Sequence, residues 1–492
     1  VVGAGLTIRR VGVAAALIDG ANAVLAGFET DGGGLDPLAS DDDPQPGGVI
    51  VTNGGALTLS DAVLLGSWAV GIELSAGSTA RLDDVALHGV RAGGGPAPDG
   101  GFGSGVTVLD GSTLDAIDLT IDGTALYGLA ASGVGSAVTV AGGAVSDDAP
   151  DPAQDSAGFG VVADLGATVD LVDVSIARTH LYAVIASGAG TTLVLTDVDA
   201  TDTQPTAAFA VGGGLLVQEG ATAVATRLAV TGSDTVGVLV DASTATFDGL
   251  TVVDTRRGPL QSTAVGVAAQ AGAVLDATGL DVRRTAGPGL VVSDARVTCG
   301  GCALAANAFA GLVVADGGDV GFTGGSIDDT VSDATEGGGV GAYVASGPYR
   351  SALTLDGAAL AGNLHAGVYV DGDGDVALTD VTVSGGPVTR AVYPTGTAVY
   401  AHGTTIAGLS IADSTIADSD GAGVFLDAAS ASLSGNRYRA NAVDVVQQLC
   451  SAATPTPAGL DAEPTDAVEL CPPLDRPVDG FVFSTVYDPV AL

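Results

Sequence analysis

The sequence predicts an all-β chain, a single-stranded parallel β-helix (β-solenoid) in which every coil adds one short strand to each of three sheets. Three observations predict it: a recurring phrase, a regular spacing between its copies, and runs of alternating polar and apolar residues. The phrase is a small polar residue, three variable positions, Gly or Ala, and then an aliphatic residue. Its copies are Ser67–Ile72, Thr124–Leu129, Thr179–Val184, Ser233–Val238, Thr285–Leu290, Asn307–Leu312, Asn363–Val368 and Ser419–Val424. Self-similarity at a period of about twenty to fifty residues is typical of solenoids.

The strand start within the phrase marks one position in each coil. It falls near positions 49, 71, 105, 128, 160, 183, 214, 237, 266, 289, 311, 341, 367, 398 and 423. The intervals alternate between 22–26 residues and about 29–34 residues, except for a short one from 289 to 311. This spacing predicts roughly sixteen coils over residues 1–445, with an insertion in every second coil.

Runs with a period of two lie between the markers and indicate strands with one buried face. Examples are Val169–Ile176 and Val376–Val383, and Gly-Ala or Gly-Ser turns such as Gly166-Ala167 precede such runs. Because only 4% of the residues are aromatic, we expect a core of Val, Leu, Ile and Ala. The polar residue of the phrase is expected at a turn, where it can cap backbone groups and stack on its counterpart in the next coil.

The phrase resembles the parallel β-helix repeat of pectin-lyase-like proteins, which also places Asn or a small polar residue shortly before Gly-Ile or Gly-Val. The resemblance covers roughly residues 1–445 and matches no specific enzyme family. It implies right-handed coiling, which is also the general hand of parallel crossovers. Polysaccharide lyases, glycoside hydrolases, adhesins and phage tailspikes share the repeat, so it predicts the fold and leaves the activity open.

Insertions in the longer coils all precede the same strand, so they are expected to project from one corner as a ridge. Insertions on one face of a solenoid often form its binding face, although neutral surface loops would give the same pattern. The candidate ridge residues are Pro96, Asp151, Pro205, Arg256, Arg257, Glu336 and Arg390.

The four cysteines form two local pairs, which favours disulfides and an oxidising, extracytoplasmic setting. Cys299-Gly-Gly-Cys302 is expected to be a structural disulfide, with a free or redox pair and a metal site as alternatives. Cys450 and Cys471 would close a loop in residues 446–492, a Pro-rich segment that we interpret as a disulfide-tied C-terminal cap or attachment segment.

The formal net charge is −41, and all sixteen basic residues are Arg. Such a surface repels phosphate backbones and argues against nucleic-acid binding, although the acidity also keeps a β-solenoid soluble.

No apolar run is long enough to span a membrane. Residues Arg9–Ile18 imitate a signal peptide but continue the strand pattern, so we expect a secreted chain whose leader lies upstream.

Two chemistries of the resembled family can be tested on this sequence. Polygalacturonase-like enzymes need Asn-Thr-Asp, Asp-Asp, Gly-His-Gly and Arg-x-Lys, and only Asp-Asp occurs here, at Asp83-Asp84, Asp147-Asp148 and Asp328-Asp329. With fifty-seven acidic residues such pairs arise by chance. Pectate-lyase-like elimination needs an Arg or Lys base beside a calcium-bound acidic cluster. Three arginines could supply the base, namely Arg227, Arg283 and Arg284, but the sequence places no matching acidic cluster beside any of them.

Asp371, Asp373 and Asp375 form an alternating Asp-Gly stretch, which is the best individual candidate for a calcium site, although a Gly-rich turn with solvated Asp side chains is the simpler interpretation. The four histidines, His88, His180, His365 and His402, are scattered in sequence.

The leading hypothesis is therefore an exported, non-catalytic scaffold at the cell surface, adhesive or filament-forming. Its partners would be other copies of itself, joined head to tail, or extracellular glycans. The alternatives are a polysaccharide lyase or glycoside hydrolase, and a glycan-binding module that does not cleave.

Overall fold

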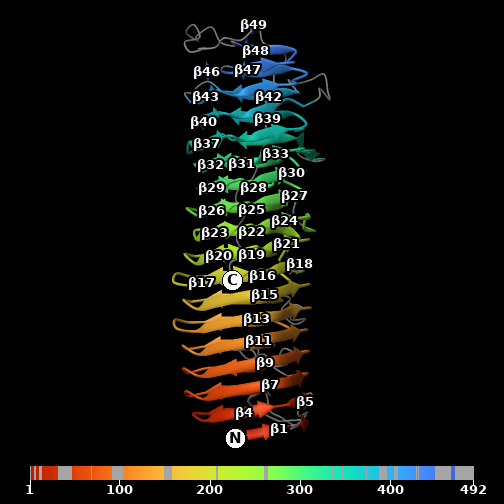
Figure 1. Ribbon diagram of the computed structural model, residues 1–492, viewed down its shortest axis with the longest axis vertical. Helices are drawn as coiled ribbons and strands as arrows, with labels where there is room; N and C mark the ends of the chain where they lie inside the picture. The colour runs from red at the N-terminus through yellow and green to blue at the C-terminus, as the bar shows by residue number, and fades with distance from the viewer. Residues whose placement is uncertain are drawn as a thin grey trace. The chain divides into compact units, whose positions relative to one another are not determined.

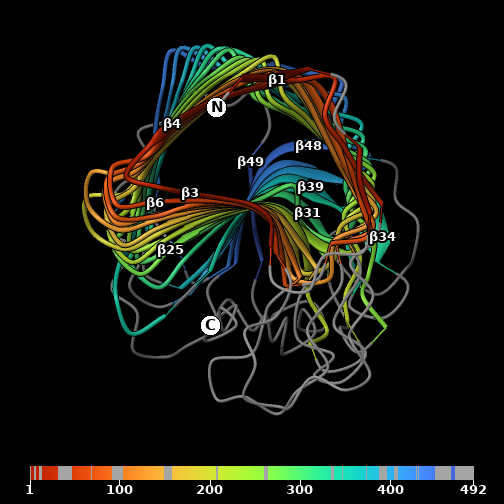
Figure 2. The same cartoon turned by 90° about the horizontal axis from the view of Figure 1, so that it is seen from below.

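The computed structural model describes residues 2–4, 7–9, 14–31, 47–67, 69–90, 103–148, 158–206, 209–259, 264–333, 337–345, 347–372, 374–386, 396–403, 408–427, 429, 431–448 and 467–470. The chain forms two compact units. The N-terminal unit comprises Val1–Leu239, Ser243–Ala245 and Gly258–Ser262, and the C-terminal unit comprises Val240–Ala242, Thr246–Arg257 and Thr263–Leu492. Within each unit, parallel strands stack rung upon rung in three sheets (Figures 1 and 2).

Sheet 1 contains the strands that open with the aliphatic marker of the repeated phrase. In the N-terminal unit it comprises β3(Ala14–Asp19), β6(Gly47–Thr52), β8(Val70–Leu74), β10(Ser104–Leu109), β12(Tyr127–Ser132), β14(Phe159–Asp164), β16(Tyr182–Ser187) and β19(Gly212–Gln218). β22(Thr235–Asp241) belongs to both units. In the C-terminal unit sheet 1 comprises β25(Val265–Gln270), β28(Leu290–Ser293), β31(Ala310–Ala315), β36(Val340–Val344), β39(Ala366–Asp371), β42(Thr397–His402), β45(Ala422–Asp427), β48(Val443–Gln448) and β49(Ala467–Leu470).

Sheets 2 and 3 follow sheet 1 in every coil. In the N-terminal unit sheet 2 begins with β1(Val2–Ala4) and β4(Asn22–Ala26), and sheet 3 with β2(Thr7–Arg9) and β5(Glu29–Asp31). Five ten-residue strands then continue through both sheets: β7(Ala56–Leu65), β9(Thr79–His88), β11(Thr113–Asp122), β13(Ala137–Ser146) and β15(Thr168–Ala177). They are followed by β17(Thr192–Thr196) and β20(Thr222–Thr226) in sheet 2, and by β18(Asp199–Thr201) and β21(Ala229–Thr231) in sheet 3.

The C-terminal unit repeats this arrangement with separate short strands, after β23(Thr244–Asp248), which both units share. Its sheet 2 comprises β26(Val274–Thr278), β29(Arg296–Gly300), β32(Asp319–Thr323), β37(Ser351–Asp356), β40(Gly374–Thr379), β43(Leu409–Ala412) and β46(Ala431–Ser434). Its sheet 3 comprises β24(Thr251–Val253), β27(Asp281–Arg283), β30(Ala303–Ala305), β33(Ser326–Asp328), β38(Ala359–Ala361), β41(Thr382–Ser384), β44(Thr415–Ala417) and β47(Arg437–Arg439). One insertion forms a small antiparallel pair, β34(Ser332–Asp333) and β35(Gly337–Gly338).

The core is aliphatic, as predicted. Strands pair in step, so that inward side chains such as Val106, Leu129 and Val161 follow one another on successive rungs. Sheet 2 strands alternate buried and exposed residues, whereas sheet 1 strands are buried on both faces, as in β31. A strand covered on both faces reads as a continuous apolar run, which explains why the marker segments look uniformly hydrophobic. The predicted right-handed parallel β-helix is confirmed.

The coils turn through left-handed backbone at their corners, among them the corner between sheets 2 and 3 and the corner between sheets 3 and 1. Many of these corner residues are Asp, which tolerates a positive φ better than most residues because its short side chain bonds locally. Asp84 (φ 54°), Asp147 (55°) and Asp329 (54°) are such corner residues, and each belongs to an Asp-Asp pair in the sequence. The pairs that suggested acid and base catalysis therefore mark chain turns.

The end of the chain adds one strand to sheet 1, because β49 pairs in parallel with β48. Most of the predicted cap over residues 446–492, including Cys450 and Cys471, lies outside the described residues, so its role stays a prediction. In the described ranges no helix has the length and apolarity needed to cross a membrane.

Candidate functional site

A line of buried polar residues, which we call the corner ladder, follows the left-handed turn between sheets 3 and 1. It contains the polar residue of the repeated phrase and its counterparts in the longer coils. In the N-terminal unit its members include Thr124, Asp148, Thr179, Thr203 and Ser233, and in the C-terminal unit Thr255, Thr285, Asn307, Thr330, Asn363, Ser419 and Asn441. All except Asn441 are fully buried.

The asparagines of the corner ladder join consecutive rungs through the backbone, as predicted for the phrase. Asn307 Oδ1 accepts a hydrogen bond from the Thr285 N–H (3.1 Å), and its Nδ2 donates to the Val282 carbonyl (3.1 Å). Asn363 makes the same two bonds with Thr330 (3.2 Å) and Ile327 (3.0 Å). Each asparagine thus satisfies one donor and one acceptor that the turn leaves unpaired.

Arginine and aspartate at the left-handed corners pair from one rung to the next. The guanidinium of Arg178 holds both carboxylate oxygens of Asp147, at 2.5 Å each, and Arg284 holds Asp254 in the same way, at 2.6 and 3.0 Å. Arg227 pairs with Asp197 of the preceding rung, whereas Arg283 pairs with Asp281 of its own strand, β27. The bond to Asp254 raises the pKa of Arg284, which makes the neutral form that a general base needs still scarcer. The three arginines considered as lyase bases are therefore engaged in ion pairs.

Three carboxylates and an arginine do meet in the N-terminal unit, which the sequence did not predict. Asp147 binds Arg178, and the neighbouring Asp122 accepts from the Ser146 hydroxyl (3.0 Å) and lies 3.6 Å from His88 Nδ1. Asp148 is fully buried, and its backbone carbonyl lies 2.8 Å from His180 Nδ1. The hydrogen bonds from Arg178 lower the pKa of Asp147. Asp122 and Asp147 are thus held by neighbouring side chains, and Asp148 is sealed from solvent within the corner.

The outer face of sheet 1 in the C-terminal unit carries a stack of aromatic rings, which we call the tyrosine strip: Tyr343, Tyr369, Tyr400 and Phe425. The rings occupy paired positions on β36, β39, β42 and β45. The Tyr369 and Tyr400 centroids are 4.8 Å apart, and those of Tyr400 and Phe425 are 5.4 Å apart, both pairs nearly parallel. The sequence held the signal, because an aromatic residue follows the marker Gly or Ala by two positions in four of its coils.

Beside the tyrosine strip, Asp371, His402 and Asp427 occupy matched positions on three consecutive rungs. His402 Nδ1 lies 3.0 Å from Asp427 Oδ2, and the Tyr343 hydroxyl donates to Asp371 at 3.5 Å. Burial raises the pKa of Asp371, while the nearby His402 acts in the opposite direction. The carboxylate of Asp427 is nearly buried, whereas His402 is 44% exposed. Only the contacts between rungs reveal this Asp-His-Asp row.

The residues proposed for calcium have separate partners in the structure. Asp371, at the end of the sheet 1 strand β39, accepts a hydrogen bond from the Tyr343 hydroxyl. Asp375 instead pairs with Arg350, with 2.6 Å between Asp375 Oδ1 and Arg350 Nη2. Asp373 lies outside the described residues. No group of three or more His, Cys, Asp or Glu side chains in the described part of the chain is arranged to hold a metal ion.

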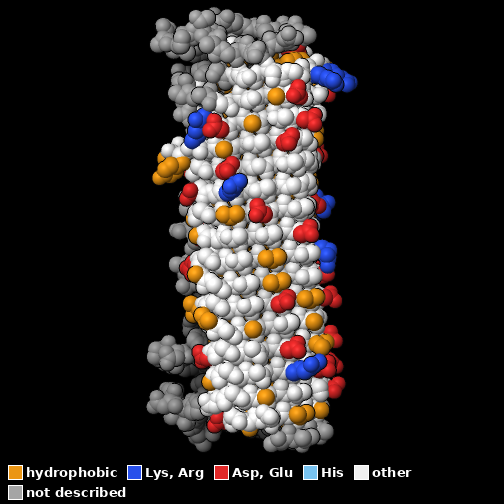
Figure 3. Space-filling model, turned by 60° about the vertical axis from the view of Figure 1, so that its left-hand side comes forward, with side chains coloured by type: hydrophobic (Ala, Val, Ile, Leu, Met, Phe, Trp, Pro, Cys, Tyr) orange, Lys and Arg blue, Asp and Glu red, His pale blue; other side chains and the backbone are white. Residues whose placement is uncertain are grey.

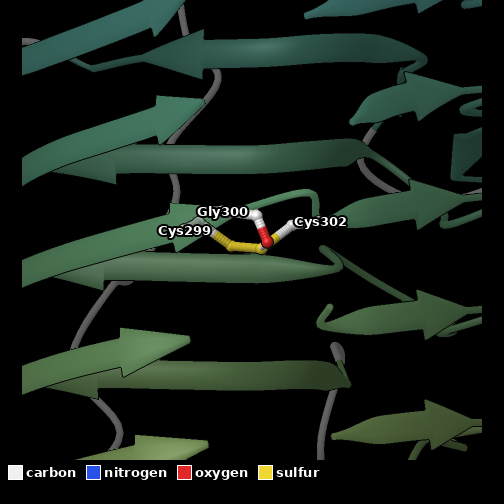
Figure 4. The surroundings of a disulfide bond; sticks show 3 residues. All are labelled: Cys299, Gly300 and Cys302. Atoms are coloured by element: carbon white, nitrogen blue, oxygen red, sulfur yellow. Dashed lines mark hydrogen bonds between the residues drawn. A yellow bond between two sulfur atoms is a disulfide. The ribbon is translucent and has the colours of Figure 1, made fainter. Parts of the chain in front are cut away.

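Cys299 and Cys302 form the predicted disulfide across the corner between β29 and β30 (Figure 4). Gly301 lies between them in left-handed backbone (φ 62°), and both cysteines are fully buried. The disulfide belongs to the core of the corner and not to an accessible redox site.

Replacing both of these cysteines by alanine is expected to lower the free energy of unfolding by about 2 kcal/mol, because the closed loop is very short. Thiol labelling of protein purified under oxidising conditions checks the bond itself. We expect no label at Cys299 or Cys302 until the protein is unfolded and reduced. Labelling of either of these two residues in the native, unreduced protein would contradict the assignment.

The candidate ridge residues fall only partly within the described structure. Pro96, Asp151, Glu336 and Arg390 lie outside it. Pro205 and Arg257 are half-buried and Arg256 is exposed, and Arg257 donates to the Ala286 carbonyl (3.2 Å). These three residues lie between a sheet 3 strand and the next sheet 1 strand, where the sequence placed them. The binding role of the ridge stays a prediction.

No protein-family model and no curated protein matches the sequence. Among solved structures, a chain in the cryo-EM structure of the Vag8–C1 inhibitor complex is similar, with 16% identity and a TM-score of 0.43; the match covers 91% of this chain and 95% of that chain. The crystal structure of the periplasmic alginate epimerase AlgG gives 10% identity and a TM-score of 0.26, covering 75% and 76%. These similarities are too distant to indicate an activity. The parallel rungs, the three sheets and the corner ladder identify the chain as a right-handed parallel β-helix protein.

Proposed function

We propose that this protein is an exported, non-catalytic β-helix scaffold that acts at the cell surface, through adhesion or self-assembly. The observation that carries the proposal is the use of its candidate acids and bases to build rungs. Asp84, Asp147 and Asp329 turn the chain, and Arg227 and Arg284 pair with aspartates of the preceding rung. Groups committed in this way are unsuited to proton transfer.

The distribution of charge supports the same function. On the face drawn in Figure 3, acidic side chains are dispersed, and the Arg side chains lie among them rather than in a separate patch. A dispersed acidic surface favours solubility and interaction with cationic partners over a focused substrate site. The buried disulfide supports an oxidising, extracytoplasmic location.

A carbohydrate-active enzyme is the second candidate, and one observation favours it. Asp427 Oδ2 can accept a hydrogen bond from the Nδ1–H of His402, which would leave Nε2 as a base beside the rings of the tyrosine strip. An imidazole oriented by a carboxylate is a common catalytic arrangement. A scaffold predicts that this pair only stabilises the rungs.

Incubation with uronate-containing and neutral glycans, with and without calcium, separates the two candidates. The scaffold predicts neither new reducing ends nor unsaturated products. Turnover that is lost in His402→Ala and kept in His88→Ala would establish the enzyme, because His88 is also half-exposed and close to an aspartate. Sedimentation of the intact chain at increasing concentration then tests self-assembly, and retention of glycans without products would indicate a binding module.

A further inference from the structure

Asp148 occupies a corner-ladder position that asparagine fills elsewhere. Its Oδ1 accepts from the Thr124 N–H at 3.3 Å and also from the Thr124 hydroxyl. The corresponding amide-oxygen bonds of Asn307, Asn363 and Asn441 measure 3.1, 3.2 and 3.3 Å. Asp148 Oδ1 therefore replaces the amide oxygen of an asparagine.

The second oxygen of Asp148 lies where the asparagines place their amide nitrogen. Asp148 Oδ2 is 2.9 Å from the point where a Cβ would stand on Gly128, the marker glycine of the preceding rung. The Nδ2 atoms of Asn307, Asn363 and Asn441 lie 2.5, 2.7 and 2.9 Å from the same point on Gly289, Gly341 and Gly423.

In the asparagines this nitrogen donates to a backbone carbonyl of the preceding rung. The carbonyl belongs to the residue three positions before the one whose N–H donates to Oδ1. The acceptors are Val282, Ile327 and Ile416, and the equivalent carbonyl for Asp148 belongs to Ile121. Asp148 Oδ2 is buried and makes no hydrogen bond within the described part of the chain. If Asp148 were ionised, its Oδ2 would take the place of the nitrogen that donates to the carbonyl in the asparagine corners. Two hydrogen-bond acceptors would then meet with no proton between them, in a site closed to water.

We infer that Asp148 is a neutral carboxylic acid in the folded protein, standing in for an asparagine, and that its ionisation is a pH-sensitive weak point of the N-terminal unit. It directly precedes the insertion at residues 149–157, so the pH effect acts at the base of a candidate ridge loop.

The surrounding charges support a neutral form of Asp148. The carboxylates of Asp122 and Asp147 act on Asp148, and the guanidinium of Arg178 is held by Asp147 rather than by Asp148. His180 contacts only the backbone carbonyl of Asp148 through Nδ1, and His88 lies beside Asp122. Burial raises the pKa of Asp148 well above its usual range, with Asp122 and Asp147 adding to the increase.

The direction of the pH dependence follows from this raised pKa. Below the pKa of an unfolded aspartate, about 4, both states carry the proton and the residue costs nothing. As the pH rises through the interval up to the folded pKa, only the unfolded state releases the proton, so Asp148 favours unfolding progressively more. Above that interval the cost is constant.

The test compares the unfolding of the intact protein and of Asp148→Asn from about pH 4 to pH 8. We expect Asp148→Asn to be the more stable protein at neutral pH, with a folding constant relative to wild type that rises up to about tenfold per pH unit inside the interval. Charge effects common to both proteins cancel in this ratio. A ratio that does not change with pH, or a less stable Asp148→Asn, would overturn the inference.

The reciprocal variant Asn307→Asp provides a matched control in the C-terminal unit. It should be destabilised at neutral pH and recover on acidification, because it creates the same buried carboxyl opposite the Val282 carbonyl. Hydrogen exchange of the Thr124 amide in wild-type protein is a local readout. Its protection should decrease, after correction for intrinsic exchange, over the same pH interval. Failure of acid to rescue Asn307→Asp, or pH-independent protection of Thr124, would contradict the inference.

Discussion

Replacing Tyr400 by alanine is expected to lower the free energy of unfolding of the C-terminal unit by about 3–5 kcal/mol, the usual cost of truncating a buried aromatic ring. Tyr400 is 2% exposed and stacks between Tyr369 and Phe425. The deletion therefore removes two ring contacts and leaves a cavity within the tyrosine strip. Chemical denaturation followed by circular dichroism measures the loss.

Tyr400→Phe is the matched control. The Tyr400 hydroxyl is buried and makes no hydrogen bond within the described residues. Its removal should therefore leave stability unchanged or slightly higher. A loss in Tyr400→Phe as large as that in Tyr400→Ala would show that the hydroxyl, and not ring packing, is the important group of the strip.

Replacing Asn363 by alanine is expected to cost about 3 kcal/mol, because the Thr330 N–H and the Ile327 carbonyl each lose their partner in a buried corner. The measurement is again the free energy of unfolding. Thr354→Ala, an exposed change on β37 in the same unit, should stay within about 0.5 kcal/mol of wild type. Equal effects of the two changes would contradict a structural role for the corner ladder.

The sequence predicted the fold because a solenoid repeats its constraints in every coil. Each rung needs an apolar strand start, a small polar corner residue and a left-handed turn, so the signals of Gly128, Gly289 and Gly367 reinforce one another. The marker positions fell on sheet 1 strands, and the Cys299–Cys302 disulfide was confirmed. These features depend on neighbouring residues in the chain or on its period.

The candidate sites were less predictable because they form between coils. His402 and Asp427 are 25 residues apart, and only the register of β42 and β45 places them side by side. Asp148 resembled half of a catalytic pair until its corner-ladder position was known. Insertions change the coil length, so the sequence separation of stacked residues varies, and their pairing requires the strand register.

The central claim is that the recurring polar residues join rungs instead of forming a surface site, and hydrogen exchange at their partners tests it most directly. The amides of Thr285, Thr330 and Ser419 are expected to exchange as slowly as the neighbouring strand amides, because each is bonded to an asparagine of the next rung. Exchange as fast as that of exposed loop amides would contradict the account.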